Sequence, residues 1–97
     1  MPRFYIEPSQ TGNYKYNALF VRGDGSMKTV RFGDRRYQDF LQHGNTERRQ
    51  NYLTRHRARE DWSDPETAGS LSRWILWGDS KKLEDNIKAF KTRFGYT

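Results

Sequence analysis

Apolar and polar residues alternate along the first third of the chain, which is the pattern of strands with one buried face. The alternation runs over residues 3–7, where Pro8 ends it, then over 14–21 and again over 27–32. The loop 23–26, which reads GDGS, separates the last two stretches and has the composition of a hairpin turn. The sequence therefore predicts an antiparallel sheet of about three strands, with the longest stretch, 14–21, in the centre.

The same alternation predicts which side chains of the sheet point into the core, because successive residues of a strand face opposite ways. Val30 and Phe32 are expected to face inward. Phe4 and Ile6 share one face of the first stretch, and Tyr14, Tyr16, Ala18 and Phe20 share one face of the second.

After the strands, apolar residues recur at the spacing of a helix instead of at every second position. A helix of about two turns is predicted over 34–42, ended by Gly44. A second helix is predicted over 46–60, with Asn45 or Thr46 as its N-cap. This longer helix is rich in arginine, so its surface is expected to be strongly basic.

Large apolar residues run together only in the stretch 68–78, which reads AGSLSRWILWG. On a helix that advances about 100° per residue, Leu71 and Ile75 share a face, Trp74 flanks it, and Trp77 points nearly opposite. A helix that is apolar around most of its circumference must be buried on two sides. We expect that cover to come from other elements of the chain or from a partner protein.

Turn-forming residues predict where the last two helices begin. Asp64, which precedes Pro65, is the expected N-cap of the tryptophan-rich helix, and residues 79–80 are the expected N-cap of the final helix. The final helix has one narrow apolar stripe and ends at Gly95, where a left-handed C-cap is expected. The residues of the stripe are Leu83, Ile87, Phe90 and Phe94.

These elements together predict the α+β class: a small antiparallel meander of about three strands followed by three or four short helices. The chain has 97 residues, which allows one domain over 1–97, with strands mainly in 1–33 and helices mainly in 34–97. Only 33% of the residues are hydrophobic while 15% are aromatic, so the core must be built from a few large rings. No internal repeat or linker divides the sequence.

Charge favours acidic or phosphate-rich partners, because the chain carries a net charge of +6 and has a pI near 9.8. The absence of cysteine excludes a disulfide framework, a Cys-ligated zinc site and a thiol nucleophile. No apolar run approaches the roughly 20 residues that a membrane helix needs, and the start at Met1 has no signal-peptide pattern. We therefore expect an intracellular chain that does not span a membrane.

Residues suited to catalysis or metal binding are scattered. The two histidines, His43 and His56, lie on different predicted elements, and no nucleophile elbow or phosphate-binding glycine loop is present. We expect His56 to join Glu60 and Arg49 in a polar network that supports the core. The sequence thus predicts no enzyme activity, no cofactor and no metal site.

Two sets of residues remain as candidates for binding. The first is basic and is expected to contact phosphates or acidic side chains; Arg48, Arg55 and Arg59 form a stripe on the predicted helix 46–60, and Arg35 and Arg36 lie nearby in sequence. The second is aromatic and is expected to contact a partner protein. It consists of Trp62, Trp74 and Trp77.

Several segments also resemble a small uncharacterised protein family of nucleocytoplasmic large DNA viruses. They are KTVRFG (28–33), YQDF (37–40), YLTRH (52–56), REDW (59–62) and TAGSLSRWILW (67–77), in the order in which that family has them. The resemblance covers about two-thirds of the chain and leaves out the first 26 residues. It implies a viral protein in the virion, and in the host cell interior during assembly, and it carries no catalytic residues.

The resemblance and the residues together predict a minor structural or capsid-associated protein of a large DNA virus, whose partners are other virion proteins. The surplus of aromatic residues in 68–78 favours this interpretation. The alternative is a genome-associated protein that binds nucleic acid nonspecifically through its backbone phosphates, which the arginine stripe favours.

Overall fold

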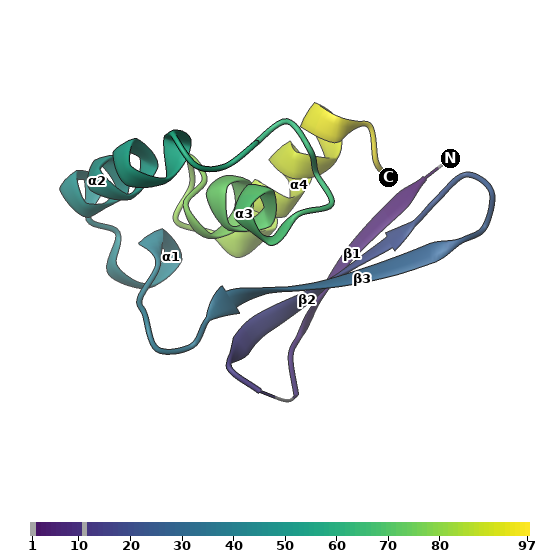
Figure 1. The fold of residues 1–97 in the computed structure, drawn as a ribbon, viewed down its shortest axis with the longest axis horizontal. Helices are drawn as coiled ribbons and strands as arrows, with labels where there is room; N and C mark the ends of the chain where they lie inside the picture. Colours follow the sequence, from purple (N-terminus) through teal and green to yellow (C-terminus); the bar gives the residue numbers. More distant parts are fainter. Residues whose placement is uncertain (1, 11) are drawn as a thin grey trace.

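The computed structural model describes residues 2–10 and 12–97, so Met1 and the part of the predicted turn at Thr11 lie outside it. Three antiparallel strands form one sheet in the order β1-β2-β3 (Figure 1). The strands are β1 (Arg3–Pro8), β2 (Tyr14–Val21) and β3 (Met27–Asp34). The predicted meander and its central strand are therefore confirmed, and the α+β class with them.

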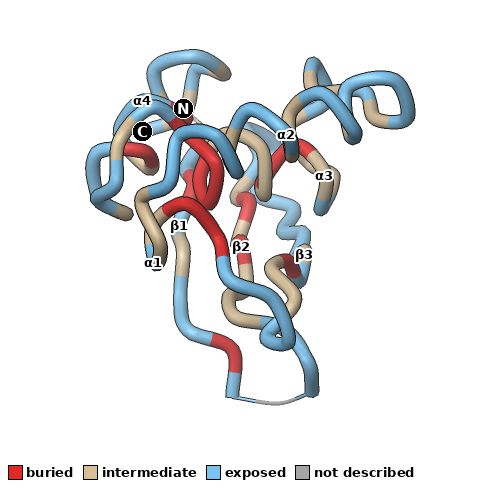
Figure 2. The backbone as a smooth tube through the Cα atoms, turned by 90° about the vertical axis from the view of Figure 1, so that its left-hand side faces the viewer, coloured by how far each residue is buried: buried red, intermediate tan, exposed pale blue. Residues whose placement is uncertain are grey.

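Helices cover one face of the sheet, and none of the described helices covers the other (Figure 1). Phe4, Phe20 and Phe32 are fully buried beneath the helices, as the alternation predicted. Figure 2 shows that the buried backbone gathers where the sheet meets the helical layer. The sheet and the helices thus share one core, to which Leu71, Ile75 and Phe90 contribute the main helical side chains.

The predicted helix over 34–42 is wrong for most of its length. Asp34 is the last residue of β3, and a turn closed by Tyr37 N–H and Asp34 O follows it, so α1 is only the single turn Phe40–His43. Asp39 sets the start of this turn, because its carboxylate accepts from Gln42 N–H while the Gln42 side chain accepts from Asp39 N–H. Gly44 ends α1 in the left-handed conformation, as expected.

Helix α2 (Thr46–Arg57) begins at the predicted residue and has Asn45 as its N-cap. It ends about one turn earlier than predicted, with Ala58 as C-cap, so Arg59 lies beyond the helix. None of its residues is fully buried. The helix instead contacts the rest of the molecule through the Tyr52 ring and through Arg49.

The tryptophan-rich segment is not one α-helix. Helix α3 (Ala68–Leu71) continues directly into a π-helical turn, η1 (Ser72–Leu76), which the Trp77 N–H closes by donating to Ser72 O at 2.9 Å. The predicted N-cap, Asp64, is wrong: Thr67 caps α3, and Asp64 accepts from Glu66 N–H in the turn before it. Pro65 and Glu66 form a separate turn, and α3 begins only at Ala68, so Asp64 lies too far upstream to cap the helix.

The segment is buried on two sides, and the chain itself supplies the cover. Leu71, Ile75 and Leu76 are buried in the core that α3 and η1 share with the sheet. On another side the Trp77 ring stacks on Tyr52 of α2, with centroids 4.1 Å apart and planes inclined by 3°. With 9% of its surface exposed, Trp77 belongs to the core. The prediction of two-sided burial is confirmed, with an intramolecular partner.

The last helix, α4 (Leu83–Phe94), has its predicted apolar stripe against the core, and Gly95 ends it with a φ of 76°. Its predicted N-cap at residues 79–80 is wrong, because the helix starts after Lys82. Asn86, which is buried, ties α4 to the end of η1. Its amide donates to Ile75 O and Ser80 O, both at 2.8 Å, and accepts from Ser80 N–H at 3.0 Å.

His43 makes stability depend on pH near neutrality. Its Nδ1 accepts a hydrogen bond from Asn45 N–H at 2.9 Å, which requires the neutral ring, and its Nε2 is buried with no hydrogen-bond partner among the described residues. Burial lowers the pKa of His43 below its ordinary value of 6.5, and the charge of Arg48 lowers it further. A histidine whose folded pKa is lowered contributes its full stability above the unfolded pKa and loses it as the pH falls.

We therefore expect the free energy of unfolding to decrease as the pH falls from about 8 to about 5, measured by urea unfolding. The matched control is His43→Asn, since the carboxamide oxygen can accept from Asn45 N–H but does not titrate in this range. In this variant the free energy of unfolding should fall less between about pH 8 and about pH 5 than in the wild type, because the contribution of His43 is absent. The same pH dependence in both proteins would contradict this assignment.

Candidate functional site

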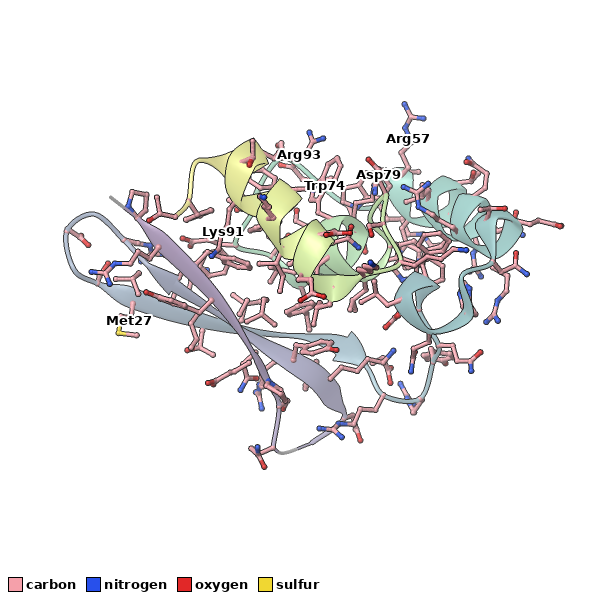
Figure 3. All side chains as sticks on the ribbon, turned by 180° about the vertical axis from the view of Figure 1, so that it is seen from behind. Met27, Arg57, Trp74, Asp79, Lys91 and Arg93 are labelled. Carbon is pink, nitrogen blue, oxygen red and sulfur yellow. The ribbon has the colours of Figure 1, made fainter. Side chains whose placement is uncertain are left out.

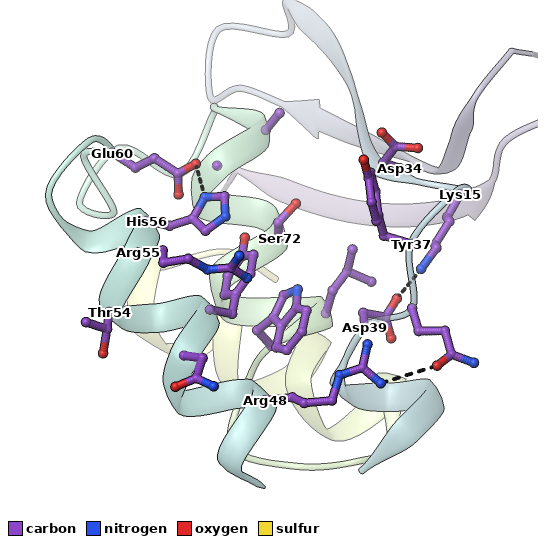
Figure 4. A pocket seen from close by; sticks show the side chains of 18 residues that line it. Lys15, Asp34, Tyr37, Asp39, Arg48, Thr54, Arg55, His56, Glu60 and Ser72 are labelled. Carbon is purple, nitrogen blue, oxygen red and sulfur yellow. Dashed lines mark hydrogen bonds and ion pairs between the residues drawn. The ribbon is translucent and has the colours of Figure 1, made fainter. Parts of the chain in front are cut away.

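A cleft of about 970 Å³ opens between the sheet and α2, at the end of the sheet where β3 leads into α1 (Figure 4). One wall consists of the turn between β3 and α1, with Tyr37 and Asp39, and of Lys15 from β2. The other wall consists of α2, with Arg48 and Arg55, and the start of α3 and η1. The cleft is therefore built by segments that lie far apart in the sequence.

Stacked rings form part of the α2 side of the cleft. Tyr52 lies between Trp77 and His56, with ring centroids 4.1 Å from each. Burial raises the pKa of the Tyr52 hydroxyl well above its ordinary value, so this group stays neutral at physiological pH. The stack fixes the position of α2 relative to η1 and supplies an apolar surface inside the cleft.

The acidic side chains on the sheet side of the cleft already have basic partners. Lys15 Nζ lies 2.7 Å from Asp39 Oδ2, and both side chains are largely buried. Asp34 accepts from the guanidinium and the backbone N–H of Arg36, which lowers the pKa of Asp34 to about 2. Asp34 is therefore ionised at neutral pH, and each of the two carboxylates has an adjacent cation.

Glu60, at the other end of the cleft, binds two side chains. Its carboxylate lies 3.1 Å from His56 Nδ1 and accepts from Trp62 Nε1 at 2.9 Å. The expected His56–Glu60 contact is confirmed. Arg49 is not part of it, because its guanidinium donates instead to Trp77 O, Gly78 O and Asp79. Arg49 thus ties α2 to the end of η1.

The arginines of α2 that face solvent have no carboxylate partner among residues 2–10 and 12–97. Arg48 and Arg55 line the cleft, and the Arg48 guanidinium makes a long hydrogen bond of 3.5 Å to Gln38. Arg57 projects from α2 away from the rest of the chain (Figure 3). Arg59 is exposed just after the helix, so the predicted stripe has two members on α2 itself.

The other two arginines predicted to contact phosphates are engaged within the fold. Arg35 Nε donates to Tyr14 O at 2.7 Å, and its guanidinium also donates to Ser9 O, which fastens the loop before β2 to the end of β3. Arg36 pairs with Asp34 at 2.8 Å. Their predicted role in binding phosphates stays a prediction.

The three tryptophans do not form one surface. Trp77 is buried under α2, whereas Trp74 lies near α4, where the guanidinium carbons of Arg73 and Arg93 are 4.2 and 3.8 Å from its ring centroid. Figure 3 shows Trp74 beside Arg93. Trp62 is half-buried, and the Trp74 Nε1–H donates to its carbonyl at 2.9 Å. A role for these residues in binding a partner stays a prediction.

Sequence reasoning missed Tyr37 and Lys15 as cleft residues. Tyr37 was assigned to the apolar spacing of a helix, yet 66% of its surface is exposed at the cleft. Lys15 falls on the outward face by strand alternation, and only the turn after β3 brings Asp39 to it. The sequence did contain one indication of this turn. Asp34 is followed by two arginines, and an aspartate in this position favours a turn in which its carboxylate pairs with Arg36.

The geometry of the cleft suits binding of an anionic, aromatic ligand. Within the described part of the chain, no cluster of three or more histidines and acidic residues could hold a metal ion. No described helix has both the length and the apolar character needed to cross a bilayer.

The chemistry that the cleft does offer consists of guanidinium groups with no carboxylate partner beside aromatic rings.

Comparison with protein families gives a match over the first part of the chain. Residues 5–56 match the model of a family of unknown function, DUF5754. The matched region includes most of the sheet, α1 and nearly all of α2, and so contains Tyr37, Arg48 and Arg55 but none of the tryptophans. It also includes residues 5–26, which the resemblance to viral proteins left out. No curated protein and no solved structure matches the chain.

Proposed function

Since the chain belongs to the DUF5754 family, whose function is unknown, we propose from its geometry that it binds nucleic acid through the phosphate backbone. The main contact surface is the side of α2 that carries Arg48 and Arg55, extended by Arg59 just beyond the C-cap Ala58. Arg57 is exposed on the opposite side of α2.

The observation that carries this proposal is the absence of carboxylate partners for these arginines, in contrast to Arg22, Arg36 and Arg49. Arg22, Arg36 and Arg49 each lie within 2.8 Å of a carboxylate oxygen. Arg48, Arg55, Arg57 and Arg59 make no such pair within the described residues, and the nearby Glu60 is bound to His56. Their charge is therefore available to an external anion, and phosphate, like carboxylate, is bound by guanidinium groups with two parallel hydrogen bonds.

Contacts of this kind give affinity without reading sequence, because phosphates are the same at every position of the strand. The net charge of +6 adds long-range attraction to the local contacts. We therefore expect binding that is nonspecific and that weakens strongly as the salt concentration rises. A genome-associated role in a large DNA virus would use such binding.

The test is to measure affinity for a DNA duplex as a function of salt in the wild type and in the triple variant Arg48→Gln, Arg55→Gln and Arg59→Gln. For the wild type, log K should fall by about 0.9 per phosphate contact for each tenfold rise in salt. The variant should have a slope that is shallower by up to about 2.7 if each arginine makes one contact. It should also bind more weakly at low salt.

A matched control removes the same charge from outside α2. Arg3 and Arg31 on the strands and Lys88 on α4 are exposed, so changing all three to Gln lowers the net charge equally. This control should keep nearly the full salt slope if α2 is the contact surface. Equal losses in the two triple variants would mean that only overall charge matters, and an unchanged slope in the α2 variant would refute the proposal.

A second candidate function, association with other virion proteins, is favoured by the open face of the sheet. Tyr5 and Met27 are 44% and 65% exposed there, and Leu19 pairs with Tyr5 across the strands. Apolar residues on an uncovered sheet face are typical of a protein contact. The aromatic residues of 68–78 no longer add to this argument, because their largest apolar surfaces are used inside the fold. Unchanged DNA binding in the α2 variant would leave this second function standing.

A further inference from the structure

The cleft beside α2 differs in character between its two walls. Arg48 and Arg55 lie on the α2 wall, and Tyr37 lies on the opposite wall (Figure 4). The volume of about 970 Å³ is within the range of about 300–1,000 Å³ that small-molecule sites occupy. A ligand with phosphate groups on one side and a flat ring on the other could contact the arginines with its phosphates and Tyr37 with its ring.

Tyr37 has the properties of a stacking platform. Its ring is 66% exposed although large aromatic side chains are usually buried. The guanidinium of Arg36 lies over the ring at 5.6 Å and is itself fixed by Asp34. Tyr37 lines the cleft and Arg36 does not, so the ring face turned from Arg36 is open to a ligand in the cleft.

The charged groups of the two walls differ in whether they have partners within the fold. On the Tyr37 wall, Lys15 pairs with Asp39 and Arg36 pairs with Asp34, and the Arg35 guanidinium donates to the carbonyls of Tyr14 and Ser9, so these cations are engaged within the fold. On α2, Arg48 and Arg55 are seven residues apart, which is about 10.5 Å along one side of a helix. Phosphates therefore belong on the α2 wall and an uncharged base belongs near Tyr37.

From this arrangement we propose that the cleft binds single-stranded nucleic acid, with one base inserted and stacked on Tyr37 and the flanking phosphates on Arg48 and Arg55. The proposal rests on the nucleic-acid binding proposed above and adds the form of the ligand. A base in a duplex is paired and stacked on its neighbours, so it cannot enter the cleft without first being unpaired. The protein should therefore bind single strands more tightly than duplexes of equal length.

The test uses a fluorescently labelled oligo(dT) of about 12 nucleotides, a length within the range of usual site sizes, and a duplex of equal length. In anisotropy titrations, Tyr37→Ala should weaken binding of oligo(dT) by at least about fivefold, the loss expected for one stacked base. The same variant should bind the duplex as the wild type does. Tyr37→Phe, which keeps the ring, should bind oligo(dT) with nearly the wild-type affinity.

A strand of equal length made of abasic nucleotides is the ligand control. It carries the phosphates but no bases, so the wild type should bind it about as weakly as Tyr37→Ala binds oligo(dT). Equal affinity of Tyr37→Ala and wild type for oligo(dT), or equal affinity of the wild type for abasic and normal strands, would overturn the inserted base. If the α2 variant still loses affinity in that case, phosphate binding stands and only this inference fails. No binding of any nucleic acid would overturn both.

Discussion

Trp77→Ala is expected to lower the free energy of unfolding by about 3–5 kcal/mol, the usual cost of removing a buried tryptophan. The indole is 9% exposed and lies flat against Tyr52. Because α2 has no fully buried residue, this stack is the principal apolar contact between α2 and the core. Loss of the ring should therefore loosen α2 as well as leave a cavity.

Urea unfolding followed by circular dichroism measures this effect. Tyr37→Ala is the matched control, because it removes an aromatic ring that is 66% exposed and should change stability by less than about 0.5 kcal/mol. Trp77→Phe should recover part of the stability, since a smaller ring can still pack on Tyr52. A cost for Trp77→Ala no larger than that of Tyr37→Ala would show that the ring is not part of the core.

Asn86→Ala should be nearly as damaging, with a loss of about 3 kcal/mol, because it leaves backbone groups of Ile75 and Ser80 without partners. The wild-type amide makes three hydrogen bonds to those groups at 2.8–3.0 Å, and its side chain is buried. These bonds hold the segment after η1 against α4.

Comparison of two further variants makes this prediction specific. Asn86→Asp keeps the shape but replaces the donor with a carboxylate facing two carbonyl oxygens, so it should destabilise at least as much as alanine. Asn51→Ala, at an exposed position of α2, should change stability by less than about 0.5 kcal/mol. If Asn86→Asp were as stable as the wild type, the amide would not be acting as a donor to Ile75 and Ser80.

The sequence by itself determined the sheet, because strand pairing follows local alternation and turn chemistry. Strand β2 has the predicted bounds, Tyr14–Val21, and the inward positions Phe4, Phe20 and Phe32 are fully buried. A shift of register by one residue would expose all of these rings, so one register is strongly favoured. The helix ends at Gly44 and Gly95 were predictable for a similar reason, since both residues adopt the left-handed conformation that glycine tolerates best.

Tertiary structure decided the course of the tryptophan-rich segment. A wheel of about 100° per residue assumes an α-helix, but the π-turn over Ser72–Leu76 rotates the later side chains and brings Trp77 onto Tyr52. Gly78 shows how tight this region is, because a Cβ there would lie 2.4 Å from Trp74 O. No local propensity encodes a π-turn; it forms where packing on several sides outweighs the regular hydrogen-bond pattern.

The candidate site was predictable only in part. The basic character of α2 follows from the sequence, and Arg48 and Arg55 were identified from helical periodicity alone. Which arginines lack partners was not predictable, because Asp34, Asp79 and Glu66 reach Arg36, Arg49 and Arg22 through turns and long-range contacts. The cleft itself arises because the chain leaves the sheet in a turn at 34–39 instead of a helix, which places Tyr37 opposite α2. Local pattern thus determined the elements and their charge, whereas long-range packing determined which charges stay available and what they face.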